Sequence, residues 1–227
     1  MSNFIICITC RLGSTRLPRK GVADVGGKPM IARCVERLSS MAPPIVVCTD
    51  RSSVLELNEA LADRNCQLFV GDPDDVLGRM LSAAQGHGAR HLVRVTGDNP
   101  LTDPQLMRAL IASHQATGAD YTYPVRMPRG TRSEVVTVNA LAALHQVTTD
   151  EERRSDVSGL LALFERTCVI DCGYPDWSEI RLTVDYPADL EVVRRVYRDF
   201  GGRPPGIPDI VSWWRYNAAC SSSPCVL

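Results

Sequence analysis

The sequence predicts an α/β fold with three layers, α/β/α, built around a mostly parallel sheet. Short β-prone runs alternate with amphipathic stretches through most of the chain, and brief Gly- and Pro-containing segments separate them. This alternation is typical of βαβ units, whose strands run parallel. The chain has 227 residues, 44% apolar and 22% charged, which is enough for one sizeable core. We therefore expect a single domain over residues 1–200 and a C-terminal extension over residues 201–227.

The first five strands and the helices between them follow from hydrophobic periodicity. The strands are expected at residues 4–9, 44–48, 67–70, 91–95 and 120–123. The helices are expected at about residues 29–40, 53–64, 75–87 and 103–117. Pro29 and Pro104 suit the first turn of a helix, and Asp103 suits the N-cap position before Pro104.

The pattern changes after residue 123. A strand-like run at 134–138 precedes a helical stretch at 140–147, and residues 150–165 predict a charged amphipathic helix. Further elements are expected as strands at 167–171 and 180–184 and as a helix from about 188 to 200. The extension is rich in Pro, Gly and Ser, so we expect it to be partly disordered.

Composition excludes several classes of protein. The formal net charge of −1 gives no global basic field for nucleic acid. No apolar run reaches the length of a membrane span, and Met1 leads into a strand rather than a signal peptide, so we expect a cytoplasmic protein without a membrane partner. The nine cysteines suit buried or free thiols. Neither they nor the four histidines show the spacing of a zinc site or a catalytic triad.

A basic loop directly follows the first expected strand. Between Arg11 and Lys20 the chain combines flexible Gly13 and the hydroxyls of Ser14 and Thr15 with four cations, Arg11, Arg16, Arg19 and Lys20. Backbone N–H groups of such a loop can converge on an anion, while arginine forks and a lysine charge bind phosphate oxygens. The alternative is a solvated basic loop. The position of the Arg11–Lys20 loop at the end of a strand favours a polyphosphate site.

Two aspartates are candidate metal ligands. Asp98 follows the expected strand at 91–95, and Asp185 follows the one at 180–184, so the two carboxylates could face each other across the sheet edge. Carboxylates there suit Mg²⁺, with phosphate oxygens and water completing its shell. Each could instead be an ordinary turn or cap aspartate. Asp75 and Arg79, one helical turn apart, could form a surface ion pair.

Four motifs in order carry a family resemblance. They are Arg11-x-Gly-Ser-x-Arg-Leu-Pro-x-Lys20 with Gly26-Gly-Lys-Pro-Met30, Gly71-x-x-x-Asp75-Val-Leu-x-Arg79, Arg94-Val-Thr-Gly-Asp-Asn-Pro-Leu101 and Arg181-Leu-Thr-Val-Asp-Tyr-Pro187. Together they resemble the cytidylyltransferases of the spore-coat polysaccharide type, which are related to CMP-sialic acid and CMP-Kdo synthetases. The resemblance implies a Rossmann-like nucleotidyltransferase (GT-A-like) fold. It also implies a small acceptor-side region at about 124–184, which often forms a dimer arm, and hence a homodimer.

The resemblance also implies roles for individual residues. Arg16 and Lys20 would be catalytic, and Asp98 and Asp185 would hold Mg²⁺. The nucleotide-binding residues would be Arg11, Leu12, Gly13, Ser14, Thr15, Arg16, Lys20, Asp75, Arg79, Thr96 and Asp98.

The acceptor-side half departs from the family pattern. Relatives usually read Pro-Asp-Gly-Leu-Asp-Val-Glu-Val where this chain has residues 128–135 with Arg129 and Arg132, preceded by Arg126. A later family histidine is missing from residues 154–159, which include Asp156. We expect Arg126, Arg129, Arg132 and Glu134 to bind a small anionic acceptor, with an arm that meets a partner subunit as the alternative.

The leading hypothesis is a Mg²⁺-dependent cytidylyltransferase that joins CMP from CTP to a sugar acid or similar acceptor and releases pyrophosphate. The alternatives are a phosphonate cytidylyltransferase of phosphonate natural-product biosynthesis, an enzyme that uses UTP or GTP, and a catalytically silent nucleotide-binding subunit. Retention of Arg16, Lys20, Asp98 and Asp185 favours an enzyme.

Overall fold

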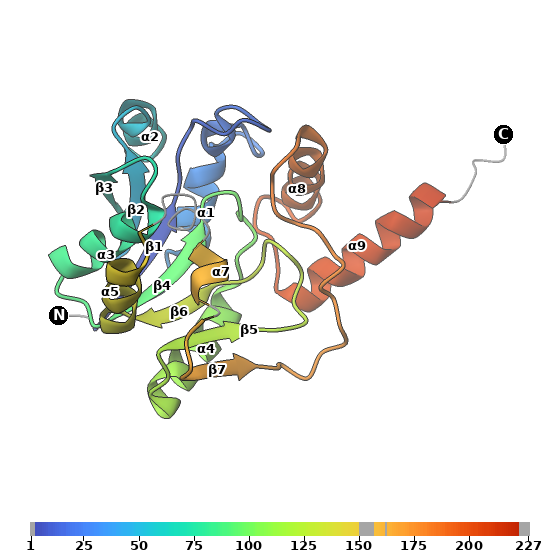
Figure 1. The fold of residues 1–227 in the computed structure, drawn as a ribbon. Coiled ribbons are helices and arrows are strands. Elements are labelled where there is room, and N and C mark those ends of the chain that lie inside the picture. The colour runs from blue at the N-terminus through green and yellow to red at the C-terminus, as the bar shows by residue number, and fades with distance from the viewer. Residues whose placement is uncertain (1–2, 150–156, 162, 223–227) are drawn as a thin grey trace, which may run out of the picture.

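A twisted sheet with helices on both faces forms the body of the protein (Figure 1). The structure is a computed structural model that describes residues 3–149, 157–161 and 163–222. Within these residues the sheet has seven strands in the order β3-β2-β1-β4-β6-β5-β7. The strands are β1 (Phe4–Thr9), β2 (Ile45–Asp50), β3 (Gln67–Gly71), β4 (His91–Thr96), β5 (Tyr121–Pro124), β6 (Glu134–Thr137) and β7 (Thr167–Ile170).

The sheet is mostly parallel, as predicted. Strands β1 to β4 are parallel to one another, and β7 is parallel to β5, whereas β6 runs antiparallel to both β4 and β5. Thr9 and Thr96, the last residues of β1 and β4, lie directly opposite each other. The loops that follow these two central strands therefore leave the sheet side by side.

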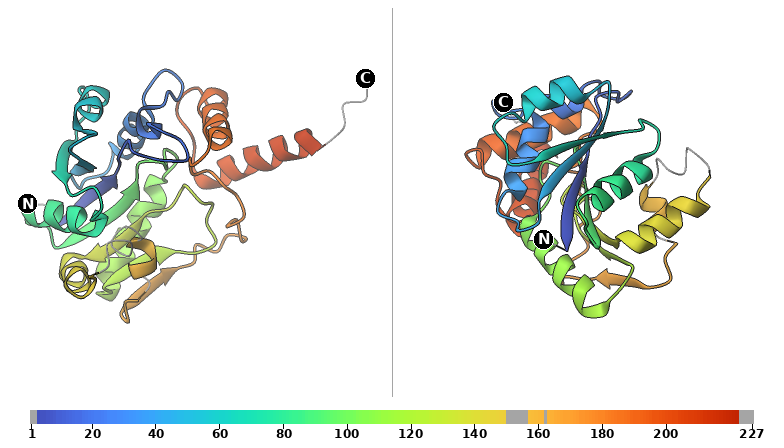
Figure 2. Two further views of the ribbon diagram at one scale, coloured as in Figure 1. Left: turned by 45° about the horizontal axis from the view of Figure 1, so that its top comes forward. Right: turned by 90° about the vertical axis from the view of Figure 1, so that its left-hand side faces the viewer.

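The helices form two outer layers, which Figure 2 shows edge-on. On one face α3, α5 and α7 pack against Ile5, Cys7 and Leu92, and on the other α1, α4, α8 and α9 pack against Ile6 and Val93. This arrangement confirms the predicted three layers. The helices are η1 (Lys20–Val22), α1 (Met30–Leu38), α2 (Val54–Ala60), α3 (Val76–Gly86), α4 (Pro104–Thr117), α5 (Val138–Val147), α7 (Val157–Leu161), α8 (Pro187–Asp199) and α9 (Ile207–Ser222).

The predicted cap of α4 is confirmed. Asp103 Oδ1 accepts hydrogen bonds from the backbone N–H groups of Gln105 and Leu106, at 2.9 and 2.8 Å, and Pro104 occupies the first turn. Pro29, in contrast, is the N-cap of α1 and lies one residue before its first turn. The helix start is thus one residue later than the sequence indicated.

The predicted strand at 180–184 is wrong. This segment makes a single bridge, between Arg181 and Arg129, instead of joining the sheet. Arg129 N–H donates to Ile180 O at 2.9 Å, and Leu182 N–H donates to Arg129 O at 2.7 Å. Because its partner lies in the loop between β5 and β6 rather than in a strand, no ladder extends from this bridge.

The C-terminal extension is more regular than expected. Residues 207–222 form α9, whose first turns are anchored by buried Ile207, Ile210 and Val211 and whose far end projects away from the body (Figure 1). The residues 223–227, and residues 150–156 and 162 of the helix expected at 150–165, lie outside the described residues. In the described part of the chain, no helix combines the length and apolar character that crossing a membrane requires.

Candidate active site

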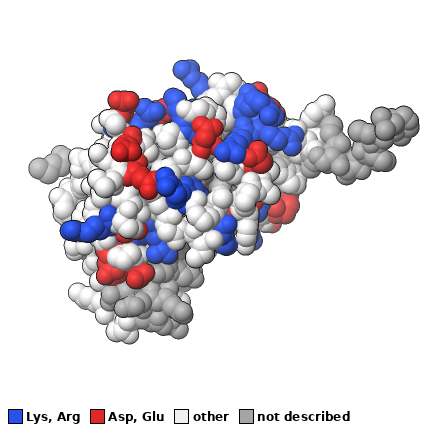
Figure 3. Space-filling model, turned by 90° about the horizontal axis from the view of Figure 1, so that it is seen from above, with Lys and Arg blue, Asp and Glu red and all other residues white. Residues whose placement is uncertain are grey.

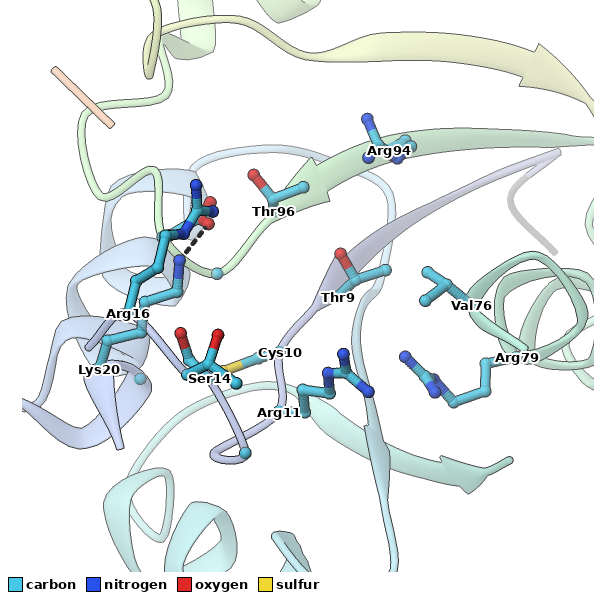
Figure 4. Close-up of a pocket in the computed structure, with 15 residues that line it drawn as sticks. Thr9, Cys10, Arg11, Ser14, Arg16, Lys20, Val76, Arg79, Arg94 and Thr96 are labelled. Atoms are coloured by element: carbon cyan, nitrogen blue, oxygen red, sulfur yellow. Dashed lines mark hydrogen bonds and ion pairs between the residues drawn. The ribbon is translucent and has the colours of Figure 1, made fainter. Parts of the chain in front are cut away.

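The loop after β1 lines a cleft of about 390 Å³ at the carboxyl end of the sheet (Figure 4). The loop after β4 lies against it, with Gly97 N–H donating to Thr9 O at 2.8 Å. A Cβ atom at Gly97 would come within 2.8 Å of Cys10 Cβ, so glycine permits this close approach. The cleft is lined by Thr9, Cys10, Arg11, Gly13, Ser14, Thr15, Arg16, Lys20, Gly21, Val76, Arg79, Arg94, Thr96, Gly97 and Asp98.

Most of the predicted nucleotide-binding residues line this cleft, but Leu12 and Asp75 do not. The Leu12 side chain is buried in the core, and its N–H donates to Ser53 Oγ at 2.9 Å. Leu12 therefore anchors the loop, while the small residues Gly13 to Thr15 face the cleft. Arg19 turns away from it and pairs with Glu56.

Lys20 joins the two aspartates that were predicted to bind metal. Its Nζ donates to Asp98 Oδ2 at 2.7 Å, to Asp185 Oδ1 at 3.1 Å and to the backbone oxygen of Val184 at 2.9 Å. Val184 N–H in turn donates to Asp98 O at 3.0 Å. The structure therefore brings Asp98 and Asp185 together, as the sequence predicted, within reach of one ammonium group.

Asp185 lies just before α8 rather than at a strand end. Arg16 donates to its Oδ1 and Arg181 to its Oδ2, each at 2.8 Å. Burial raises the pKa of the Asp185 carboxyl, but the hydrogen bond and charge of Lys20, the hydrogen bond from Arg181 and the charge of Arg16 outweigh burial and lower it. Asp185 is thus held ionised.

Asp189, which the sequence analysis missed, fixes the position of Asp185. Its Oδ2 accepts the backbone N–H groups of Asp185 and Tyr186, both at 2.9 Å, and its carboxylate also binds Arg181. An acidic residue in the first turn of a helix that begins with proline is the sequence signal that could have found it. On the face viewed in Figure 3, basic side chains lie among acidic ones, in keeping with such pairs.

Asp98 and Asp185 suit a magnesium ion. Carboxylate oxygens are hard ligands, and Mg²⁺ commonly takes one or two of them with substrate phosphates and water. Among the described residues, no group of three or more His, Cys, Asp or Glu side chains is placed to hold a metal. A metal held by these two aspartates would therefore draw its remaining ligands from substrate and solvent.

Asp75 and Arg79 do not form the predicted surface pair. Asp75 caps α3 by accepting Gly78 N–H at 2.7 Å, and its other oxygen lies 2.7 Å from His145 Nε2. The Arg79 side chain is buried and donates to the backbone oxygen of Asp72. Arg79 and Arg11 point into the same side of the cleft (Figure 4). The start of α3 therefore does shape this cleft.

A second cavity, of about 360 Å³, adjoins the first and shares Arg94 and Thr96 with it. Of the residues predicted to bind the acceptor, Arg129, Arg132 and Glu134 line it. Arg126 is not among them, because its guanidinium pairs with Asp171 at 3.2 Å. The full lining is Arg94, Val95, Thr96, Asn99, Arg129, Gly130, Arg132, Ser133, Glu134, Arg181, Thr183 and Asp185.

Sequence comparison finds related proteins along most of the chain. A family model described as "Cytidylyltransferase" matches residues 5–162. The spore coat polysaccharide biosynthesis protein SpsF of Bacillus subtilis is 28% identical over 216 residues, covering 90% of each chain. A 3-deoxy-manno-octulosonate cytidylyltransferase of Polynucleobacter asymbioticus is 39% identical over 111 residues, which are 46% of this chain and 42% of that protein.

Solved structures share the fold. A cytidylyltransferase from Leptospira borgpetersenii superposes with a TM-score of 0.89 at 23% identity, covering 96% of both chains. A CMP:2-keto-3-deoxy-manno-octonic acid synthetase complexed with CTP has a TM-score of 0.67 at 19% identity, covering 87% of this chain and 99% of that one. The nucleotidyltransferase fold predicted from the sequence is thereby confirmed.

Proposed function

Because this chain belongs to the cytidylyltransferase family, whose members are CTP-dependent nucleotidyltransferases, we propose that it transfers CMP from CTP to a small anionic acceptor and releases pyrophosphate. One observation carries the proposal. Lys20 holds Asp98, in the first cavity, and Asp185, in the second, at the place where the two cavities meet.

The first cavity fits the nucleotide. Backbone N–H groups of Gly13 to Thr15 and the side chains of Arg11 and Arg16 would surround the triphosphate with positive charge. The N-terminal part of α3 would flank the rest of the nucleotide. The reaction depends on such positioning and charge rather than on a covalent intermediate.

Asp98 and Asp185 would hold Mg²⁺ when it is bound. The ion would supply positive charge against the phosphates as pyrophosphate departs. Lys20 and Arg16, which now neutralise the two carboxylates, would then turn to the phosphates of the nucleotide. Arg181, through its own hydrogen bond, and Asp189, through the backbone N–H of Asp185, would keep Asp185 in place.

The transfer of CMP from CTP to the acceptor requires no further reactant. A lone pair on the acceptor oxygen attacks the α-phosphorus, and the bond from this phosphorus to the bridging oxygen breaks. Pyrophosphate leaves with that electron pair. A phosphonate or carboxylate oxygen attacks as an anion and loses no proton, whereas a sugar hydroxyl releases its proton to solvent.

The second cavity fits an acceptor with a strong negative charge. Arg129 and Arg132 are exposed on its wall, and within the described residues neither guanidinium forms an ion pair. Two arginine forks suit a carboxylate or a phosphonate. This observation keeps a phosphonate beside a sugar acid as the candidate acceptor. The homodimer stays a prediction of the family resemblance, and the cytoplasmic location stays a prediction of the sequence pattern.

The decisive experiment follows pyrophosphate release with each NTP, Mg²⁺ and a panel of sugar acids and phosphonates. We expect release with CTP and one acid class. Release with UTP or GTP instead would contradict the choice of nucleotide, and no release with any pair, despite CTP binding, would indicate a silent subunit.

The acceptor site has its own test on the acceptor so found. The double variant Arg129→Gln with Arg132→Gln should raise the acceptor KM at least tenfold and leave CTP binding unchanged, because two charge-assisted bonds are lost. Arg126→Gln is the matched control, since Arg126 pairs with Asp171 away from the cavity. A normal acceptor KM with loss of dimerisation in the double variant would favour the arm.

A further inference from the structure

Arg94 stands where the two cavities join. The cavities have Arg94 and Thr96 in common, and of these two residues Arg94 carries the charge. The α-phosphorus starts the reaction bonded to the ribose oxygen of the nucleotide and ends it bonded to the acceptor as well. It must therefore occupy the junction of the nucleotide cavity and the acceptor cavity.

Glu134 holds Arg94 in this position. Arg94 on β4 lies directly opposite Glu134 on β6, and its Nη1 donates to Glu134 Oε2 at 2.8 Å. Both side chains are largely buried, at 15% and 19% exposure. Burial, followed by the charge of the neighbouring Glu134, raises the pKa of Tyr121, so the hydroxyl near this ion pair stays neutral.

The location of the Arg94–Glu134 pair is unusual for a structural ion pair. The same face of the sheet is apolar one step deeper, where Leu92 on β4 lies opposite Val136 on β6 and both are fully buried. Removing an ion pair from water is costly, and apolar residues of similar size often stabilise a fold as well. A charged pair at the cavity floor is therefore better explained by a ligand than by packing.

We propose that Arg94 binds the α-phosphate of the nucleotide at the junction of the two cavities, and that Glu134 positions its guanidinium. This inference rests on the proposed function. Glu134 was expected from the sequence to bind the acceptor. Its role here is instead to hold Arg94 in place. One side of the phosphoryl group would face Asp98 and Asp185, and the Arg94 guanidinium would lie on the opposite side. Negative charge on the phosphoryl oxygens would then be stabilised from both sides.

The test compares ligands that differ in their phosphates. Cytidine, CMP and CTP, each with Mg²⁺, are titrated calorimetrically into the wild type and into Arg94→Met. Ligands that bind too weakly for direct titration are measured by competition, as the change that they cause in CTP binding. Because CMP and CTP share the α-phosphate, the variant should bind both at least tenfold more weakly, by a similar factor, and bind cytidine normally. Lys20→Met should instead weaken CTP more than CMP.

Controls separate this role from a structural one. Arg90→Met removes an exposed arginine just before β4, outside both cavities, and should change none of the three affinities. If Arg94→Met does not fold, the double variant Arg94→Met with Glu134→Gln is used in its place. The second change removes the carboxylate that would otherwise be left buried without its partner.

Three results would overturn the inference while leaving the proposed function intact. They are unchanged binding of CMP and CTP, a loss confined to CTP, and an equal loss of cytidine. A wild-type protein that fails to prefer CTP over other nucleotides would instead remove the proposed function, and the inference with it.

Discussion

Asp185 accepts hydrogen bonds from Lys20, Arg16 and Arg181, three cationic side chains from two distant parts of the chain. Its pKa is lowered below the usual carboxyl value despite burial. A carboxyl whose pKa is lower in the folded protein stabilises the fold above its unfolded pKa. This contribution is lost as the pH falls through the folded pKa.

Asp185→Asn should therefore destabilise the protein in a pH-dependent way. At pH 7 we expect the free energy of unfolding to fall by about 1–3 kcal/mol, because charge-assisted hydrogen bonds are lost. The difference from wild type should shrink below about pH 4, where the unfolded carboxyl is protonated. Urea unfolding of both proteins from pH 3 to pH 8 measures it, and a constant difference across this range would contradict the role of ionisation.

Asp98→Asn tests the second carboxylate through activity. It keeps the size of the side chain but removes an anionic oxygen, so turnover should fall by orders of magnitude if Asp98 holds the metal. Asp171→Asn, which alters an exposed aspartate outside both cavities, is the control and should keep wild-type turnover. Near-normal turnover of Asp98→Asn at limiting Mg²⁺ would remove Asp98 from the metal site.

At the level of single residues, the sequence predicted the site residues that lie in short local motifs. Lys20, Asp98 and Asp185 were predicted because each lies in a short, recognisable pattern, and the structure brings them together. Arg94 and its partner Glu134 form a pair across strands that are 40 residues apart in the chain. Such a pair depends on strand register, which no local pattern specifies.

At the level of elements, the segment 180–184 shows why a correct pattern can give a wrong strand. Ile180, Leu182 and Val184 are buried, while Arg181 and Thr183 between them are partly exposed, so the alternation is real. Period-two burial requires an extended backbone, but a strand also requires a partner of sufficient length. Here the partner is the loop at residues 128–130.

Gly130 makes this contact possible, and its replacement is a sensitive test. A Cβ atom there would lie 2.4 Å from backbone atoms of Leu182 and Thr183, and the residue has a φ of 100°. We expect Gly130→Ala to lower the free energy of unfolding by about 3 kcal/mol or more, from strain and overlap together. Chemical denaturation measures the change.

Gly173→Ala is the matched control for Gly130. Gly173 also has a positive φ, of 72°, but a Cβ atom there would meet no other segment of the described chain within 4 Å. Its replacement should lower the free energy of unfolding by only about 1 kcal/mol, because the backbone conformation alone is strained. Equal losses in the two variants would mean that the close contact with residues 182–183 contributes nothing.

At the level of the whole molecule, the strand–helix alternation was sufficient to predict the layers and the parallel core of the sheet. It could not predict that β6 inserts antiparallel between β4 and β5, because strand order depends on how long connections fold back. The second cavity lies against the start of this inserted strand, through Glu134 and the preceding Ser133. The acceptor side was therefore the less predictable half.

Ligand binding by the folded molecule supplies a prediction at this scale. CTP with Mg²⁺ should raise the melting temperature more than ATP, GTP or UTP, since the family uses CTP. At about 100 times its Kd, CTP should add roughly 2.7 kcal/mol to the free energy of unfolding. Thermal scans at matched concentrations test this, and equal shifts with all four nucleotides would leave a phosphate site without base selectivity.

The contact between Lys20 and Asp185 spans 165 residues of sequence. During synthesis on the ribosome, Lys20 can meet Asp98 before Asp185 is made, because Lys20 and Asp98 are separated by only 78 residues. Asp185 arrives much later, together with the start of α8 that holds it. A chain that stopped before Asp185 would thus possess the phosphate loop but lack the completed centre, and catalytic competence would be acquired only after the start of α8 has emerged.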